Sequence, residues 1–210
     1  MKEYNKIIAH YERCLDKHGD NHLGVDWPKL EDVDTRYKIM LDIIKLNEES
    51  DRKVSLLDFG CGTGHLLDFV HRNNKKNIIY SGLDISQKFI DVAKKKYPDN
   101  SFYCIDILDS KDSIGNFDYV VMNGVFTEKR ELSYDEMWNY FTKMITVIYE
   151  KCNNGFAFNV MSKNVDWERE DLFHVSHDIL SSFLCANLTR NYIIRNDYGL
   201  YEYTVYVFKK

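Results

Sequence analysis

The chain has 210 residues, 44% of them hydrophobic, and a formal net charge of -5. A chain of this length can bury a full core, so we expect one domain rather than two large ones. The acidic balance argues against a general nucleic-acid surface, which normally shows a clustered excess of Lys and Arg. Five scattered cysteines without a C-x-x-C pair argue against structural zinc and suit a reducing compartment.

The N-terminal residues M-K-E-Y-N-K lack the apolar core of a signal peptide, and no apolar run approaches the ~18 residues that would span a bilayer. We therefore expect a cytoplasmic protein with no membrane partner. The one basic cluster, residues 94–96, falls on an amphipathic pattern that is typical of a solvated helix face. No nucleic-acid partner is expected, and the sequence leaves a monomer and a homodimer both open.

The first 50 residues carry two helical patterns with a break between them. Apolar spacing predicts one helix from Tyr4 to Leu15 and another from Val33 to Ile44. Residues 18–28 contain two glycines and a proline, which interrupt the pattern. Within this break, Trp27 is either a core or hinge aromatic beside Pro28 or a ring that packs on a cofactor or substrate.

Residues 54–70, V-S-L-L-D-F-G-C-G-T-G-H-L-L-D-F-V, are typical of a strand, a glycine turn and a helix. Glycine lets the backbone approach a ligand closely, and the first N–H groups of the helix point into the turn. The dinucleotide pattern G-x-G-x-x-G would need a third glycine where this chain has His65, whereas the spacing here is G-x-G-x-G. Asp58, two residues before the first glycine, would repel a pyrophosphate and attract an ammonium group.

An acid followed by G-x-G-x-G, between a first strand and a first helix, resembles the first motif of the class I S-adenosylmethionine-dependent methyltransferases. The resemblance extends from about Val54 to the C-terminus. It implies a three-layer, Rossmann-like α/β fold with a seven-stranded, mostly parallel sheet whose last strand is antiparallel. It also implies S-adenosyl-L-methionine as cofactor and S-adenosyl-L-homocysteine as product. The loop residues expected at the cofactor are Asp58, Gly60, Cys61, Gly62 and Gly64.

The same resemblance implies that the N-terminal helices form a lid over cofactor and substrate. The expected division is a helical cap of residues 1–50 and a cofactor-binding core of residues 51–210. The segment H-G-D-x-x-x-G-V-D-W-P, followed by Arg36 and Tyr37, also resembles the N-terminal part of compact bacterial methyltransferases. Those enzymes are often associated with cell-surface carbohydrate or other small-molecule pathways.

The ends of the next two expected strands carry acids. Residues 78–83 lead to Asp84, 20 residues beyond Gly64, where an acid can accept hydrogen bonds from both ribose hydroxyls, with Ile85 beside it. An N-cap role for Asp84 is the alternative, but Ser86 is available for it. Residues 101–105 lead to Asp106 and Ile107. The resemblance implies an adenine contact for Asp106 and an apolar wall from Ile107, while ordinary turn chemistry is the alternative for Asp106.

The apolar run 117–122 predicts a buried parallel strand that delivers Asn123 to the carboxyl edge of the sheet, where ligands of open α/β sheets bind. The resemblance implies that this tip faces the methyl group and the acceptor, with Phe126 as a substrate contact. A simple Asn-Gly turn is the alternative.

The remaining chain predicts one long helix, a strand, a loop, a helix and a hairpin. A capping box from Ser133 to Glu136 opens the long helix, which we expect Gly155 to end before a strand at 156–161. Residues 162–175 show no clear period and are expected to shape the acceptor pocket, with Trp167 as a candidate contact. After a helix from Ser176, two strands at 192–195 and 201–208 are joined by a turn short enough to require antiparallel pairing.

A sulfonium cofactor carries its own driving force, so the protein must align the reacting atoms and exclude water, and no metal is required. A hydroxyl acceptor would gain from a base, for which His174 and His22 are candidates, although a structural role is the alternative for each. The tip Asn123 to Phe126 lacks the N/D-P-P-Y/F element of many methyltransferases that act on amino groups. We expect O-methylation of a small molecule bound between aromatic rings; the alternatives are small-molecule N-methylation, an NAD-dependent oxidoreductase or a non-catalytic partner with this fold.

Overall fold

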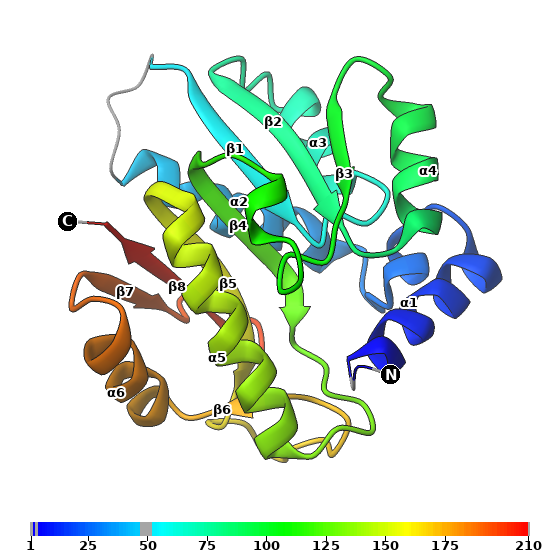
Figure 1. Ribbon diagram of the computed structural model, residues 1–210. Coiled ribbons are helices and arrows are strands. Elements are labelled where there is room, and N and C mark those ends of the chain that lie inside the picture. The colour runs from blue at the N-terminus through cyan, green and yellow to red at the C-terminus, as the bar shows by residue number, and fades with distance from the viewer. Residues whose placement is uncertain (1, 3, 47–51, 210) are drawn as a thin grey trace.

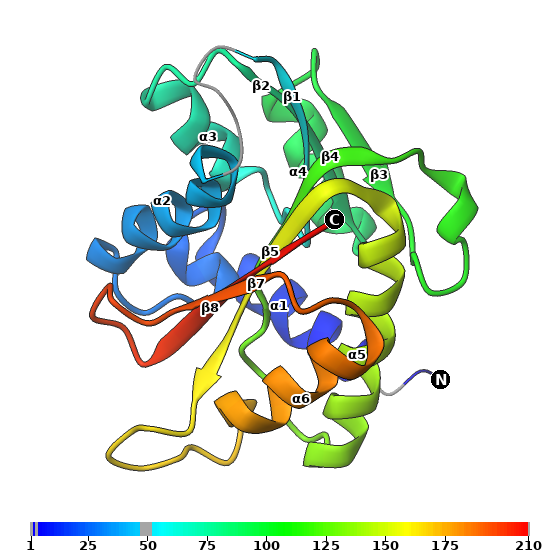
Figure 2. The same cartoon turned by 90° about the vertical axis from the view of Figure 1, so that its left-hand side faces the viewer.

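The computed structural model describes residues 2, 4–46 and 52–209. Within them, one eight-stranded sheet lies between two layers of helices (Figures 1 and 2). The strand order is β3-β2-β1-β4-β5-β8-β7, and β6 also pairs with β5. Strand β8 is antiparallel to both of its neighbours, as expected for the last strand. The strand beyond the expected seven is the two-residue β6.

The elements follow the expected alternation of strands and helices. The strands are β1 (Val54–Phe59), β2 (Ile78–Asp84), β3 (Ser101–Cys104), β4 (Phe117–Phe126), β5 (Cys152–Ser162), β6 (His174–Val175), β7 (Tyr192–Arg195) and β8 (Glu202–Phe208). The helices are α1 (Asn5–His18), α2 (Glu31–Lys45), α3 (His65–Arg72), α4 (Gln87–Lys96), α5 (Tyr134–Lys151) and α6 (His177–Asn187), with 3-10 turns η1 (His22–Val25) and η2 (Lys111–Ser113). None of the helices among the described residues is long and apolar enough to cross a lipid bilayer.

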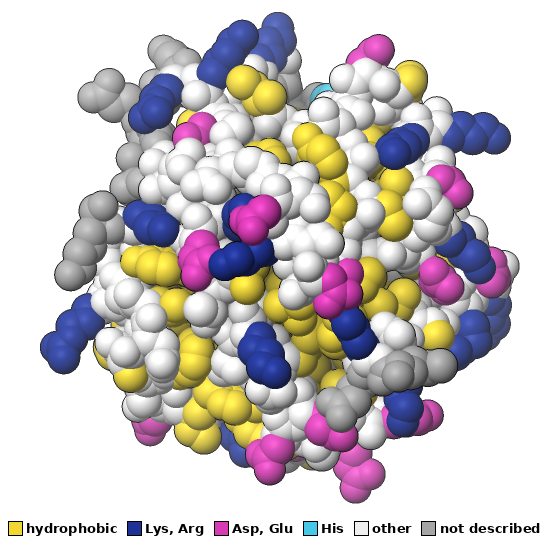
Figure 3. All heavy atoms as spheres, in the orientation of Figure 1, with side chains coloured by type: hydrophobic (Ala, Val, Ile, Leu, Met, Phe, Trp, Pro, Cys, Tyr) yellow, Lys and Arg dark blue, Asp and Glu magenta, His cyan; other side chains and the backbone are white. Residues whose placement is uncertain are grey.

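Both faces of the sheet carry apolar side chains. Successive side chains of a strand point to opposite sides, so a strand that is apolar throughout contributes to both faces. In β1, Val54 and Leu56 belong to a buried cluster with residues of α2, α3 and α4. Leu57 and Phe59 belong to a second cluster with residues of α5 and α6. Figure 2 shows these two layers on opposite sides of the sheet. Outside, on the face of Figure 1, Lys and Arg side chains are interspersed with Asp and Glu (Figure 3).

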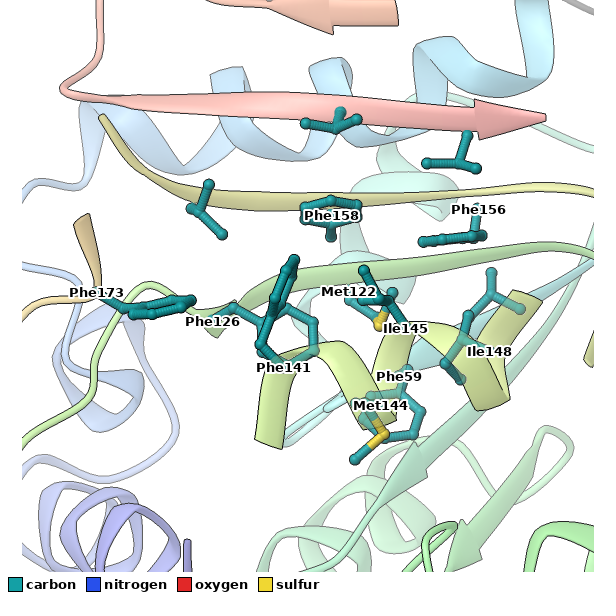
Figure 4. Packing of buried hydrophobic residues seen from close by; sticks show 14 of the residues in the cluster. Phe59, Met122, Phe126, Phe141, Met144, Ile145, Ile148, Phe156, Phe158 and Phe173 are labelled. Atoms are coloured by element: carbon teal, nitrogen blue, oxygen red, sulfur yellow. The ribbon is translucent and has the colours of Figure 1, made fainter. Parts of the chain in front are cut away.

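Aromatic rings hold α5 against β4 and β5 (Figure 4). The ring centroid of Phe126 lies 5.0 Å from that of Phe141, which in turn lies 5.3 Å from that of Phe158. All three side chains are fully buried. Phe126 is therefore a core residue, although we expected it at the acceptor, because its ring points toward α5.

Two expected boundaries are wrong. Helix α5 ends at Lys151, and Gly155 lies inside β5, where a Cβ atom would come within 2.6 Å of the Val207 carbonyl oxygen. Gly155 thus permits close strand pairing and does not cap a helix. Strand β4 continues through Asn123 to Phe126, with a register shift against β5 after Met122. Gly124, at φ +79°, supplies the left-handed residue of this irregularity.

Candidate functional site

A cavity opens at the carboxyl ends of β1, β2 and β4, between these strand ends and α1 with η1. Figure 1 shows α1 beside the ends toward which these strands point. The cavity contains about 1140 Å³ of space, part of which is open solvent. The expected site residues that line it are Asp58, Gly60, Cys61, Gly62, Asp84, Ile85, Asp106, Ile107, Asn123 and Trp27.

The glycine loop turns back onto β2. The N–H groups of Gly60 and Cys61 both donate to the Leu83 carbonyl oxygen, at 2.7 and 3.0 Å. Gly60 has φ +71°, and a Cβ atom there would lie 2.7 Å from Cγ2 of Val125, near the end of the neighbouring strand β4. Gly64 is not among the residues that line the cavity; it is the N-cap residue of α3 and packs against Tyr97. The loop backbone itself is therefore the cavity wall.

Asp58 is a buried carboxyl group at the end of β1. Its Oδ2 accepts a hydrogen bond of 2.7 Å from the Tyr80 hydroxyl. Burial raises the pKa of Asp58 to about 7; the Tyr80 hydrogen bond opposes this rise and the nearby Asp84 adds to it. A cation that enters the cavity would therefore meet a carboxyl group poised to ionise near neutral pH.

Asp84 ends β2 and is held by backbone donors. Its two oxygens accept from the N–H groups of Gly62, at 3.0 Å, and Ser86, at 2.9 Å. Burial raises the pKa of Asp84 against these two hydrogen bonds. Ser86 takes the N-cap of α4, as expected, because its hydroxyl accepts from Phe89. Asp84 is thus fixed in orientation with one edge toward the cavity.

Asp106 follows β3 and binds the N-terminal segment. Its Oδ2 accepts from the Tyr4 hydroxyl at 2.5 Å and from Nζ of Lys2 at 2.6 Å. Although burial acts in the opposite direction, these hydrogen bonds hold the pKa of Asp106 below its ordinary value. The Tyr4 ring packs on Tyr140 at 4.7 Å. The start of the chain therefore covers the third strand end.

Asn123 carries the site's unpaired amide. Neither its Oδ1 nor its Nδ2, both buried, has a hydrogen-bond partner among the described residues. A buried polar group without a partner is costly, and each such case calls for an explanation. Since Asn123 lines the cavity, a bound molecule is the partner that this position lacks.

A family model described as a methyltransferase domain matches residues 57–144. A Mycobacterium tuberculosis protein named "Putative methyltransferase Rv1506c" is 26% identical over 160 residues, which cover 74% of this chain and 93% of that protein. The chain is a class I S-adenosylmethionine-dependent methyltransferase. The match favours S-adenosylmethionine over a dinucleotide as the ligand of the glycine loop.

Solved structures agree on the fold of this methyltransferase. A magnesium protoporphyrin IX methyltransferase from Synechocystis PCC 6803, solved with bound S-adenosylmethionine, has a TM-score of 0.62 at 14% identity and covers 100% of this chain and 95% of that one. An S-adenosylmethionine-dependent methyltransferase from Leishmania major has a TM-score of 0.66 at 12% identity, covering 99% and 83%. At these identities the likeness concerns the fold alone.

Several expected site residues do not line the cavity of this methyltransferase. Both ring nitrogens of His174 are engaged: Nδ1 lies 2.6 Å from the Ser162 carbonyl oxygen, and Nε2 accepts from the backbone N–H of Arg169. His22 Nδ1 lies 2.7 Å from the Trp27 carbonyl oxygen. Trp167 is 72% exposed. The two histidines therefore hold loops in place.

The sequence reasoning missed the residues that α1 contributes. Tyr4, Ile7, Ile8 and Tyr11 line the cavity. Their helical spacing predicted an amphipathic helix, but spacing alone does not say what the apolar face covers. An aromatic-rich face on a helix that precedes the glycine loop was the signal available.

A charged cluster lies beside the cavity, where Tyr11 meets η1 and the end of β4. One ligand atom each from His10, Cys14 and Asp26 lie within 4.8 Å of one another, a spacing that suits a metal ion. The Arg130 guanidinium already supplies a cation, because its Nη2 lies 2.5 Å from Oδ2 of Asp26. Burial raises the pKa of Glu128 in this cluster to about 7, opposed by Arg130. We assign no metal to it.

Proposed function

We propose that this methyltransferase transfers the methyl group of S-adenosylmethionine to an oxygen atom of a small-molecule acceptor. The observation that carries the proposal is the convergence of three strand-end carboxyl groups and one unpaired amide on a single cavity beneath α1. The sulfonium supplies the electrophilic methyl group, and the protein has to orient the reacting atoms and exclude water.

Each end of the cofactor has a matching group. Asp58 would face the ammonium group, since a carboxyl group attracts this charge. Asp84 would accept hydrogen bonds from the ribose hydroxyls, and Asp106 with Ile107 would hold the adenine. The glycine loop would let the cofactor approach the backbone closely, because Gly60 has no side chain and a Cβ atom there would clash with Val125. Asn123 would lie nearest the methyl group.

The acceptor would lie between η1, α1 and the end of β4. Trp27, Tyr11 and Val25 give this part of the cavity aromatic and apolar walls, which suit a compact organic molecule. The proposal requires no base from His174 or His22. It needs neither nucleic acid nor a second subunit, because one chain supplies the walls. Residues 1–50 would act as the cap, although the boundary itself falls in residues 47–51, outside the described residues.

Cofactor choice is tested by thermal unfolding with S-adenosylhomocysteine or NAD. A ligand at 100 times its Kd adds about 2.7 kcal/mol, and each kcal/mol raises Tm by roughly 2–4 °C for a chain of this size. We expect such a rise with S-adenosylhomocysteine and none with NAD. The variant Asp84→Asn, which removes a charged ribose acceptor, should reduce the rise. A rise with NAD alone would contradict the proposal.

Acceptor class is tested with S-adenosylmethionine carrying a 13C-labelled methyl group. The protein is incubated with a deproteinised small-molecule extract, and labelled products are identified by mass and carbon NMR. We expect a methyl carbon bonded to oxygen in a small molecule. Label bonded to nitrogen would contradict the O-directed part, and label found only in added nucleic acid would contradict the acceptor class.

A further inference from the structure

Three polar side chains from separate elements are connected behind the tip of β4. Nε of Arg36, on α2, lies 3.1 and 3.0 Å from the two carboxylate oxygens of Glu202, at the start of β8. Nδ2 of Asn159, on β5, donates to Glu202 Oε1 at 2.8 Å. The N–H of Gly124, on β4, donates to Asn159 Oδ1 at 2.7 Å. The chain of bonds thus runs from α2 to the residue next to Asn123.

This arrangement is costly for the interior of a sheet. Asn159 is fully buried and Glu202 is 4% exposed. A buried ion pair is often no more stable than apolar residues of similar volume, because both charges lose their hydration. What the polar groups provide is direction, since hydrogen bonds fix the angle of a backbone group that apolar packing leaves free.

The bond to Gly124 falls where β4 departs from regular pairing with β5. Gly124 has φ +79°. Its N–H donates to Asn159, and its carbonyl oxygen accepts from the Thr127 hydroxyl at 3.1 Å. Side chains in a strand alternate between faces, so a shift of one residue here would turn Asn123 away from the cavity. The anchored Gly124 keeps the Asn123 amide on the cavity side.

The other end of the chain of bonds reaches the acceptor wall. The Arg36 guanidinium lies 5.1 Å from the centre of the Trp27 ring. A Cβ atom at Gly124 would lie 3.3 Å from Nε1 of the same ring. Arg36 and Gly124 therefore both lie against the Trp27 ring, and the bonds through Glu202 and Asn159 connect them.

We propose that Arg36, Glu202 and Asn159 are positioning residues that aim Asn123 and Trp27 at the point of methyl transfer. This inference rests on the proposed function, in which Asn123 faces the methyl group. The three residues act through Gly124 and Trp27, and none of them lines the cavity. The adenosine-binding groups Asp84 and Asp106 lie on other strand ends, so cofactor affinity and methyl-side geometry are separable.

The test needs no acceptor. Sinefungin is a cofactor analogue with an amine-bearing carbon in place of the methylated sulfur, so its affinity relative to S-adenosylhomocysteine reports groups that face the methyl position. Both dissociation constants are measured by calorimetry for wild type, N159D, N159D/E202Q, N123A and N123A/N159D. N159D replaces the amide donor with a carboxylate, which repels the Glu202 carboxylate. Adding E202Q supplies an amide donor from position 202, so a hydrogen bond between the two side chains can form again.

We expect wild type to bind sinefungin more tightly than S-adenosylhomocysteine. N159D and N123A should each lower this preference about tenfold, the value of one hydrogen bond to a charged group, while S-adenosylhomocysteine affinity stays within about threefold. N159D/E202Q should recover much of the preference. N123A/N159D should lose no more than N123A alone, because Asn159 acts through Asn123.

Tyr203→Phe is the matched control, since it removes a buried hydrogen bond from β8, to the Val175 carbonyl oxygen, and leaves the three residues untouched. It should lower Tm and keep the preference for sinefungin. Should N159D fail to fold, Arg36→Lys takes its place with the same expected loss. An unchanged preference in folded N159D or R36K would overturn the inference alone, whereas wild type that binds neither analogue would overturn the proposed function with it.

Discussion

At the scale of single residues, Asp58 ties the stability of the fold to pH. Its folded-state pKa of about 7 lies above its ordinary value, so the fold favours the protonated form. This contribution is fully present below pH ~4 and is lost as pH rises through 7. Asp58→Asn, neutral at every pH, should unfold with a free energy higher than wild type at pH 8, by up to about 4 kcal/mol.

Urea unfolding at pH 8 and pH 5 measures this difference, which should shrink at the lower pH. The asparagine side chain of D58N can still accept from Tyr80 through its amide oxygen, so the hydrogen bond of 2.7 Å is kept. A destabilised D58N at pH 8 would show that Asp58 is ionised at little cost in the unliganded protein.

The same residue should make ligand affinity depend on pH. S-adenosylhomocysteine carries an ammonium group, which the proposed function places against Asp58, and binding strengthens as this carboxyl group ionises. Calorimetry should show wild-type affinity rising about tenfold or more between pH 5.5 and pH 8. D58N should bind weakly with little dependence on pH over this range. A pH profile shared by both proteins would assign the titration to another group.

The residues at strand ends were predictable because parallel strands bring their carboxyl ends to one edge. From sequence alone, this rule places Asp58, Asp84, Asp106 and Asn123 together, and all four line the cavity. His174 was not predictable in this way. Its ring is buried between the carbonyl of Ser162, the last residue of β5, and the N–H of Arg169, in the following loop, which has no sequence period.

At the scale of elements, the side chain that the glycine loop can carry at position 60 is limited by Val125 on the neighbouring strand β4. Gly60→Ala adds a Cβ atom 2.7 Å from Val125 at φ +71°, whereas Gly199→Ala adds one at φ +75° in open space. The left-handed backbone costs an L-residue roughly 1–2 kcal/mol at either site, and crowding adds about 1–3 kcal/mol at Gly60 alone. Denaturant unfolding should show G60A less stable than G199A by that second amount, with S-adenosylhomocysteine binding weakened only in G60A. Equal losses would mean that Val125 moves aside freely.

Element boundaries were harder to predict than the elements themselves. The capping box at Ser133 was confirmed, since both of its hydrogen bonds form. The expected end of that helix at Gly155 was wrong, because this glycine pairs with Phe208 of β8 inside the sheet and does not lie at a helix end. Long-range pairing with β8 decides this boundary, and no local pattern around Gly155 reports such pairing.

At the scale of the whole molecule, α1 is held over the cavity by polar contacts as well as by its buried apolar face. Ser86 donates to Glu12 at 2.5 Å, and Lys88 lies 2.8 Å from Asp16. Asp20, just beyond the helix, lies 2.8 Å from Nζ of Lys96. The exposed Lys88–Asp16 pair contributes about 0–1 kcal/mol, so we expect α1 to open locally at a lower free energy than the core. The fold thus combines a three-layer core with a helix that covers the cavity and can open locally.

Ligand binding should therefore slow hydrogen exchange in α1 more than elsewhere. If S-adenosylhomocysteine binds only when α1 is closed, a concentration of 100 times Kd should slow exchange of locally opening α1 amides by up to ~100-fold. The outer turn of α6 is the control, since no residue of α6 lines the cavity and the helix packs through Leu180 and Leu184 in the buried cluster that it shares with α5. Its locally opening amides should keep their rates. Exchange in both helices is measured by mass spectrometry of peptides from each. Equal slowing in α1 and α6 would mean that the ligand stabilises the whole fold without engaging α1 as a lid.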